Sequence, residues 1–174
     1  MNYFELFNID VGFDLDLAQL SADYQKLQKV SHPDRFATAS DKQKLIAVQQ
    51  SAQLNDAYST LKSPLPRAEY LLSLKGIDLN HEKTTMQDNL FLMQQMEWRE
   101  QLEDIKHAQD IDALESLDEE MQTQIRLHLQ RVKDWLATDC SQSHHSAADE
   151  VRKLKFLYKL RDEIAHLEEK LSND

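Results

Sequence analysis

Residues 17–34 read LAQLSADYQKLQKVSHPD, in which leucine or tyrosine recurs at steps of three and four before a His-Pro-Asp tripeptide. These steps draw one apolar stripe along a helix, at Leu17, Leu20, Tyr24 and Leu27. Pro33 has no amide hydrogen and disfavours helical dihedrals at His32, so the helix must end near Val30 or Ser31. His32, Pro33 and Asp34 are therefore predicted to lie in a loop.

A second helix is predicted on the far side of this loop. It should begin around Asp41 and stop at Pro64. At the other end of the first helix, Asp14 or Asp16 can cap the first turn. The apolar positions of the second helix are Leu45, Val48, Ala52 and Leu61, with Leu54, Ala57 and Tyr58 beside them. The two helices should therefore pack as an antiparallel hairpin.

Short segments flank this hairpin. Residues 3–7, YFELF, are too short for a stable helix alone, and we expect their aromatic side chains to dock on the hairpin. Pro66 can start one more short helix, which ends at Gly76. The polar stretch after Gly76 is typical of a domain boundary.

Three longer helices are predicted in the rest of the chain, over about 86–109, 112–139 and 146–171. The last one has a seam suited to antiparallel packing, at Leu157, Leu160, Ile164, Leu167 and Leu171. The middle one has a matching stripe, at Leu114, Leu117, Met121, Ile125, Val132 and Leu136. His144 and His145, flanked by serines, are predicted to lie in the turn between these two helices and make a poor metal site.

The predicted fold class is all-α, because no segment alternates as a strand would. We divide the chain into a hairpin domain at 1–75, a linker at 76–85 and a three-helix bundle at 86–174. Residues 1–75 carry 8 basic and 9 acidic side chains, whereas residues 76–174 carry 12 and 22. This uneven charge indicates that the two domains have different roles.

The composition excludes several functional classes. The 174 residues carry a net charge of −11 and include only two glycines and one cysteine, which excludes glycine-rich nucleotide loops and a disulfide framework. No Cys/His cluster has zinc-ligand spacing, so we expect no metal and no cofactor. The acidic excess disfavours nucleic acid, and the absence of a long apolar run disfavours a membrane. We expect a cytoplasmic protein.

Three interpretations of the tripeptide can be weighed from the residues alone. It can be an ordinary turn in which Asp34 caps the next segment. It can be a catalytic pair with His32 as base, but no serine or cysteine nucleophile has a recognisable context and Pro33 keeps the pair from forming a ready relay. It can also be a stiff apex for docking, because proline fixes one backbone dihedral between two polar side chains.

The wider context resembles a known family. The leucine stripe with Lys26 and Lys29, the tripeptide, and the segment NDAYSTLKSP at 55–64 are similar to the J domain of DnaJ-type co-chaperones. The opening Tyr3-Phe4, the run HPDRF at 32–36, the segment PRAEYLL at 66–72 and the acidic second part with Phe91-Leu92-Met93 resemble the HscB family, which serves iron–sulfur cluster assembly. Ser31 stands where J domains commonly have an aromatic residue.

This resemblance implies a partner for the tripeptide. In such proteins the tripeptide engages a DnaK-type ATPase chaperone, here of the HscA kind, and promotes ATP hydrolysis. The corresponding residues are His32, Pro33 and Asp34, together with Lys26, Lys29 and Arg35. An exposed aspartate can take an arginine of the partner, and the basic side chains can meet an acidic surface and raise the rate of encounter.

The helix predicted at 86–109 has two apolar faces. At 100° per residue, one face holds the core-type positions Phe91, Trp98, Leu102 and Ile105. The other holds Leu92, Met93, Met96, Glu97, Glu100 and Asp104. This second face is either a partner surface rimmed by carboxylates or a sign that the helix is sandwiched in the bundle. Phe156, at the margin of the last seam, can join the surface or the core.

The HscB resemblance implies that the second face is a partner surface. In that family the C-terminal bundle binds the IscU-type scaffold protein on which iron–sulfur clusters are assembled. The positions that carry this role here are Leu92, Met93, Met96, Glu97, Glu100, Asp104 and Phe156.

The function expected from the sequence is therefore that of a non-enzymatic adaptor. Its first domain stimulates an ATPase chaperone, and its second domain presents the scaffold protein to that chaperone. Two rival functions remain: a helical interaction module that holds a basic partner, with an incidental tripeptide, and a hydrolase that uses His32 as its base.

Overall fold

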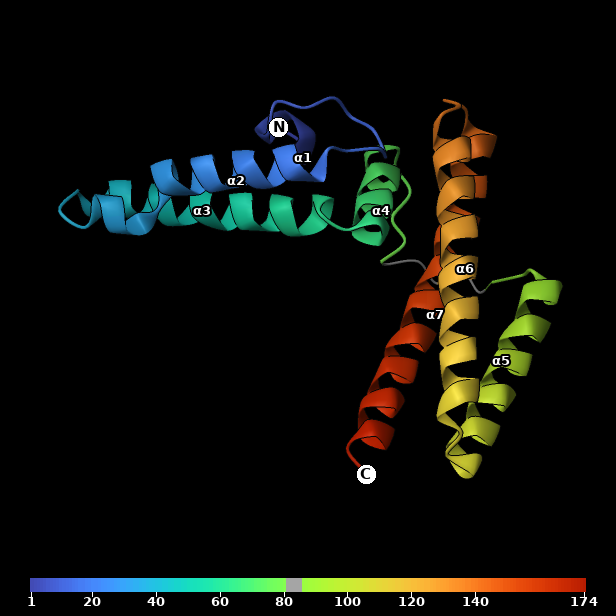
Figure 1. Cartoon of the computed structure of the whole chain (residues 1–174). Coiled ribbons are helices and arrows are strands. Elements are labelled where there is room, and N and C mark those ends of the chain that lie inside the picture. The colour runs from blue at the N-terminus through green and yellow to red at the C-terminus, as the bar shows by residue number, and fades with distance from the viewer. Residues whose placement is uncertain (81–85) are drawn as a thin grey trace. The chain divides into compact units, whose positions relative to one another are not determined.

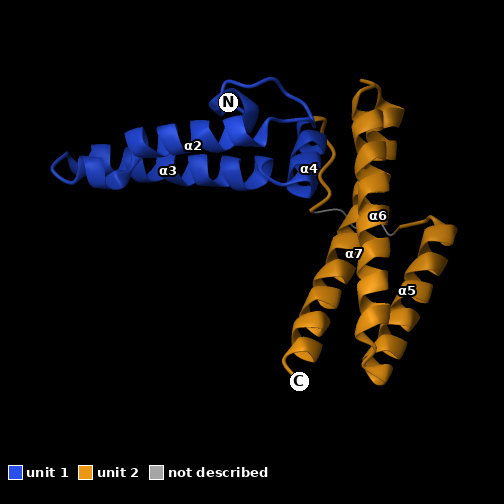
Figure 2. Ribbon diagram, viewed as in Figure 1, with its two compact units in different colours: residues 1–74 blue, residues 75–174 orange. Residues whose placement is uncertain are grey.

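The computed structural model describes residues 1–80 and 86–174, in which every regular element is a helix (Figure 1). The chain divides into two compact units, residues 1–74 and 75–174 (Figure 2). The predicted all-α class is confirmed for the described residues. Part of the predicted linker, residues 81–85, lies outside them.

Unit 1 is a helical hairpin of α2 and α3 with two shorter helices, α1 and α4, packed beside it. Its elements are α1 (Tyr3–Leu6), α2 (Leu17–Ser31), the 3-10 turn η1 (Pro33–Phe36), α3 (Asp41–Leu61) and α4 (Pro64–Leu74). Asp16 caps α2 by accepting the backbone N–H of Gln19, and α2 ends directly before the tripeptide, as predicted. The fourth helix begins at Pro64 and not at Pro66, since Pro64 supplies the fixed φ suited to a first turn.

The aromatic opening docks on the hairpin and α4, as expected. Phe4 is fully buried, and the ring of Tyr3 stacks on Tyr70 of α4 with 4.5 Å between ring centroids. The Tyr3 backbone N–H also donates to the Tyr70 hydroxyl at 2.8 Å. Inside the hairpin, the rings of Tyr24 and Tyr58 stack at 4.1 Å and join α2 to α3. These contacts hold the two long helices of unit 1 in a fixed register.

The predicted stripe of α3 is wrong in its first half. Leu45 and Val48 are 58% and 51% exposed, and Ala52 is exposed as well. The residues that α3 buries are Ala47, Leu54, Ala57 and Leu61. On α2, Leu20 is buried, whereas Leu17 and Leu27 keep 47% and 37% of their surface exposed. The alanines of α3 allow close approach of its neighbours, which a stripe of large residues would prevent.

Unit 2 consists of α5 (Asn89–Ala108), α6 (Ile111–Leu136) and α7 (Ser141–Ser172). The stripes of α6 and α7 face each other, and all their predicted positions are buried except Leu136, Leu167 and Leu171, which are half-buried. The predicted turn at His144 and His145 is wrong, because α7 already begins at Ser141. His144 instead pairs with Asp139 at 3.1 Å, and Ala147 and Ala148 are fully buried one turn later.

A polar pair is buried between α6 and α7. Nδ1 of His128 and the carboxylate of Glu150 form a hydrogen bond, and both residues are less than 10% exposed. The edge of the His128 ring also meets Phe91 of α5, with 5.9 Å between ring centroids. The pair therefore lies where all three helices meet.

Helix α5 runs beside the N-terminal half of α6 (Figure 1). Polar contacts of its cap and first half fix it there. Asp88 caps its first turn and pairs with Lys153 of α7 at 2.8 Å. The indole N–H of Trp98 donates to Glu120 of α6 at 2.9 Å, and Arg99 pairs with Glu163 of α7 at 2.6 Å. These contacts, added to its buried apolar stripe, set which face of α5 points to solvent.

Removal of the buried carboxylate should destabilise unit 2. Glu150→Ala leaves the buried imidazole of His128 without its partner, and we expect a loss of about 1–3 kcal/mol in the free energy of unfolding. Urea denaturation measures this loss. Glu169→Ala, at an exposed position of the same helix, is the matched control and should change the stability by less than about 0.5 kcal/mol. Equal effects of the two substitutions on the free energy of unfolding would show that the buried pair contributes nothing to stability.

The cap of α5 should make stability depend on pH. The ammonium of Lys153 and the backbone N–H of Phe91 lower the pKa of the Asp88 carboxyl. A lowered folded-state pKa stabilises the fold above the unfolded pKa of about 3.9, and this contribution is lost as the pH falls through the folded value.

Asp88→Asn tests this dependence, because asparagine keeps the cap and removes the charge. The urea midpoint of the variant should lie below that of the parent protein at pH 7, and the gap should narrow as the pH falls below the unfolded pKa of about 3.9. A gap that stays constant over this acidification would contradict the role of the charge.

Candidate functional site

The tripeptide forms an exposed corner between α2 and α3. His32 ends α2 with an extended ψ of 131° and caps the turn η1, where its Nδ1 accepts the backbone N–H of Asp34 at 3.2 Å. The side chain of His32 is 51% exposed and that of Asp34 is 92% exposed. Both groups are therefore accessible to a partner, at the end of two packed helices.

Asp34 does not cap the next helix, which was the role it would have in an ordinary capping turn. Ser40, and not Asp34, caps α3 by accepting the backbone N–H of Gln43, which returns the bond with its own side chain. The capping residue of η1 is His32. The carboxylate of Asp34 is thus left for other contacts.

The same corner is poorly arranged for acid–base catalysis. His32 Nδ1 and Asp34 Oδ2 are 3.5 Å apart, closer than we expected from a pair separated by proline, but this distance is too long for a strong hydrogen bond. Nδ1 already accepts a backbone N–H, whereas an orienting carboxylate needs that nitrogen as a donor.

Basic side chains surround the corner. Lys29, His32 and Arg35 line one shallow pocket with Gln28, which the sequence interpretation did not include. Lys26 is also exposed and lies one helical turn before Lys29. The structure therefore brings the six predicted positions to one end of the hairpin, where cations flank an exposed carboxylate.

The second predicted surface lies on α5. Its core face is confirmed, because Phe91, Trp98, Leu102 and Ile105 are all at least 92% buried. On the opposite face Met93 is 60% exposed and Met96 is 72% exposed, while Leu92 is half-buried. The alternative of a sandwiched helix is therefore wrong, and α5 presents an apolar face to solvent.

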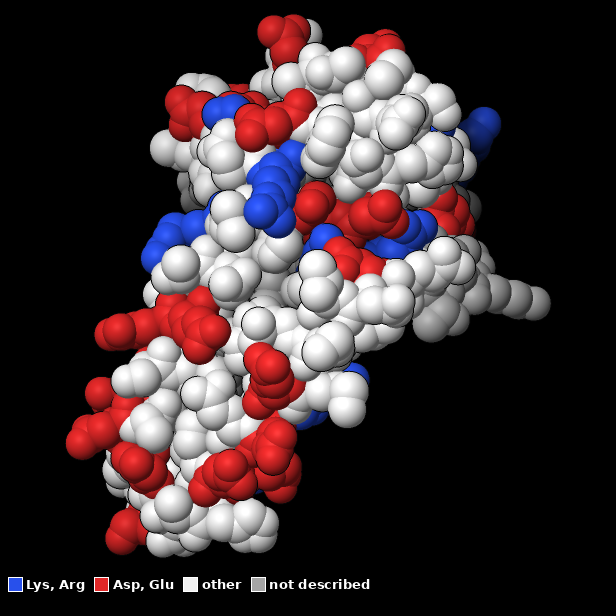
Figure 3. All heavy atoms as spheres, turned by 90° about the vertical axis from the view of Figure 1, so that its right-hand side faces the viewer, with Lys and Arg blue, Asp and Glu red and all other residues white. Residues whose placement is uncertain are grey.

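Carboxylates frame this apolar face. Glu97, Glu100 and Asp104 are exposed, and acidic side chains crowd the part of unit 2 around α5 (Figure 3). Leu90, 81% exposed at the start of the helix, was missed in the sequence interpretation. It falls near Glu97 on the helical wheel, so the same wheel extended by two residues would have included it.

Phe156 of α7 packs against the core face of α5 and not against Met93 or Met96 in any described contact. Its ring stacks on Trp98 at 6.3 Å and meets Phe91 edge-on at 6.0 Å. The guanidinium of Arg99 covers the ring at 5.4 Å. Phe156 is thus half-buried in an aromatic cluster and keeps part of its surface exposed.

The described residues include no group of three or more His, Cys, Asp or Glu side chains that could hold a metal ion. Among the helices that the structure describes, none has the length and apolarity required to cross a membrane. Cys140 is free and exposed.

Known proteins resemble the chain over almost its whole length. A family model described as the HSCB C-terminal oligomerisation domain matches residues 87–165. The co-chaperone HscB homologue of Pseudoalteromonas atlantica is 56% identical, with 99% of each chain covered. That of Colwellia psychrerythraea is 49% identical, with 100% of each covered.

Solved structures give the same result. The chaperone HscB of Vibrio cholerae is 48% identical, with a TM-score of 0.86 and coverage of 98% of this chain and 99% of that one. Human HscB is 28% identical, with a TM-score of 0.87 and coverage of 95% and 81%. On this sequence identity, on the matching helical fold and on the exposed tripeptide corner, the chain belongs to the HscB family of J-domain co-chaperones.

Proposed function

We propose that this protein is an adaptor in iron–sulfur cluster assembly. The corner around His32, Pro33 and Asp34 binds an ATPase chaperone of the HscA type and stimulates ATP hydrolysis there, and the apolar face of α5 binds an IscU-type scaffold protein. The protein itself performs no chemical step. The observation that carries this proposal is the exposure of both surfaces on rigid helical units.

The corner is suited to act on another protein. The exposed carboxylate of Asp34 can accept two hydrogen bonds from an arginine of the chaperone, and such a charge-assisted pair strengthens as the interface excludes water. Lys26, Lys29 and Arg35 would meet an acidic surface of the same partner and speed the encounter. Stimulation then requires only that the corner binds the hydrolysing conformation of the chaperone more tightly than the resting one.

The face of α5 is suited to a folded protein partner. Methionine side chains adapt to the shape of an opposing surface, and the leucines beside them add apolar area. The carboxylates of Glu97, Glu100 and Asp104 favour basic residues on that partner at the rim of the interface. Such a face has an apolar centre and a charged rim, as specific interfaces do.

Two binding surfaces on one chain explain how the protein assists its partners. When both are occupied, the scaffold protein is held near the chaperone at a high effective concentration. The exposed, unpaired thiol of Cys140 is compatible with the reducing cytoplasm, where we place this activity.

Replacement of the imidazole should abolish stimulation without unfolding unit 1. His32→Gln removes a group that is 51% exposed, so we expect unchanged helicity and melting, while stimulation of the steady-state ATPase of the chaperone falls about tenfold or more, as for a binding hot spot. His107→Gln, at an exposed position of α5, is the matched control and should leave stimulation unchanged. Full stimulation by His32→Gln would remove the corner from the proposed mechanism.

Truncation of the apolar face should prevent scaffold binding. We expect the combined substitutions Leu92→Ala, Met93→Ala and Met96→Ala to weaken binding of the purified scaffold protein by about a hundredfold in calorimetry, because the centre of the interface is lost. Leu127→Ala, which removes a 44% exposed leucine from α6, should not change the affinity. A large loss of stability in the triple variant would instead mean that these side chains belong to the core.

A further inference from the structure

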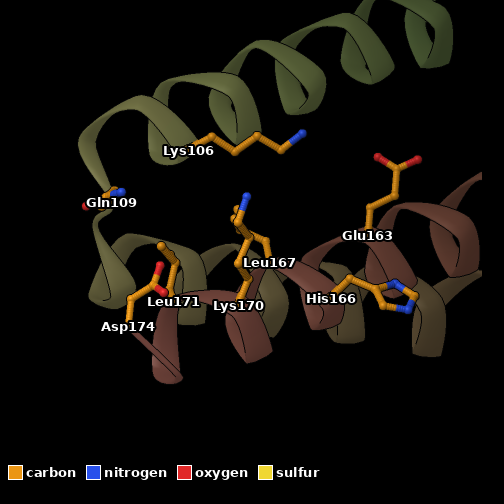
Figure 4. A pocket seen from close by; sticks show the side chains of 8 residues that line it. All are labelled: Lys106, Gln109, Glu163, His166, Leu167, Lys170, Leu171 and Asp174. Carbon is orange, nitrogen blue, oxygen red and sulfur yellow. The ribbon is translucent and has the colours of Figure 1, made fainter.

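A groove separates the last turns of α5 from the last turns of α7 (Figure 4). Its volume is about 500 Å³. The lining residues are Lys106, Gln109, Glu163, His166, Leu167, Lys170, Leu171 and Asp174. None of the interactions described so far fills this space.

The floor of the groove is apolar. Leu167 and Leu171 continue the heptad seam of α7, yet both stay half-exposed, whereas Leu157, Leu160 and Ile164 are fully buried in the same seam. The end of this apolar seam is therefore only partly covered by the other helices of unit 2. Burial of the remaining leucine surface by another molecule would be favourable.

Cationic side chains project into the groove from both walls. Lys106 reaches from α5 and the ammonium of Lys170 rises from α7 into the same space (Figure 4). Lys106 pairs with Glu103 at 3.1 Å, and Lys170 makes no ion pair with any described residue. Of the acids in the lining, Glu163 is already paired with Arg99, and Asp174 lies at the far end, beside Leu171. The groove thus offers one available ammonium, with a second nearby, in a unit that is otherwise strongly acidic.

Arg99 links the groove to the predicted scaffold-binding set. Its guanidinium pairs with Glu163, which lines the groove, and it covers the ring of Phe156, which belongs to that set. A protein that contacts Phe156 would therefore come within about one side chain of the groove.

We propose that the groove is a second part of the scaffold-binding surface, an inference that rests on the proposed function of α5. The scaffold protein places a segment with an apolar side chain and a carboxylate in the groove. The apolar group contacts Leu167 and Leu171, and the carboxylate binds Lys170 and Lys106. The acidic rim of α5 selects basic groups of the same partner, so the two regions of opposite charge fix the orientation in which it docks.

Charge reversal in the groove tests this inference. Lys106→Glu and Lys170→Glu should each weaken binding of the purified scaffold protein about tenfold in calorimetry, because a like charge then faces the carboxylate. Lys159→Glu, at an exposed position of α7 outside the groove, makes the same change in net charge and should alter the affinity less than about twofold. Lys170→Gln should have a smaller effect than Lys170→Glu and should reduce the salt dependence of binding.

The outcomes separate this inference from the function on which it rests. Wild-type affinity in both groove variants, with a large loss in the Leu92, Met93 and Met96 variant, would overturn the groove and leave the α5 surface in place. An equal loss of affinity in Lys170→Glu and Lys159→Glu would mean that only the net charge matters, which would also overturn the groove. No binding of the scaffold protein to the parent protein would overturn both. Lys106, Lys159 and Lys170 are exposed, so thermal melting should be the same for the lysine variants and the parent protein.

Discussion

Helix α5 has apolar side chains on two faces and can bury only one of them against the α6–α7 hairpin. Trp98 and Phe91 lie on the buried face, where they bury far more apolar area than the smaller side chains opposite could. The ion pairs of Asp88 and Arg99 with α7 then fix the rotation of the helix. Met93 and Met96 are thus exposed because the opposite face of α5 packs better against α6 and α7.

A comparable constraint acts in unit 1. Pro33 disfavours helical dihedrals at His32, so α2 ends at Ser31 and the 3-10 turn begins at Pro33. His32 and Asp34 therefore occupy a corner with little backbone freedom. The stacked pair of Tyr24 and Tyr58 holds the two helices that carry this corner. The corner therefore loses little conformational entropy when a partner binds it.

The sequence predicts those features that depend on local periodicity and on proline. The stop of α2, a cap at either Asp14 or Asp16 and the core face of α5 all follow from residues within a few turns of each other, and the structure selects Asp16 as the cap. It does not predict the outward face of Leu45 and Val48, because two apolar stripes on one helix have the same period and only the neighbours decide which is buried. The sequence also does not predict the buried pair of His128 and Glu150, since 22 residues separate them along the chain. The early start of α7 is hidden by a polar first turn, whose packing depends on Ala147 and Ala148.

The central claim is that two surfaces on separate helical units act at the same time. Analytical ultracentrifugation with a fluorescent scaffold protein, the ATPase chaperone and ATP tests it most directly. The account predicts that the scaffold protein sediments with the chaperone when the adaptor is present, and that this complex rises and then declines as the adaptor exceeds both partners. If each partner binds the adaptor singly but the labelled scaffold protein never sediments with the chaperone, the two surfaces are mutually exclusive and the account is wrong.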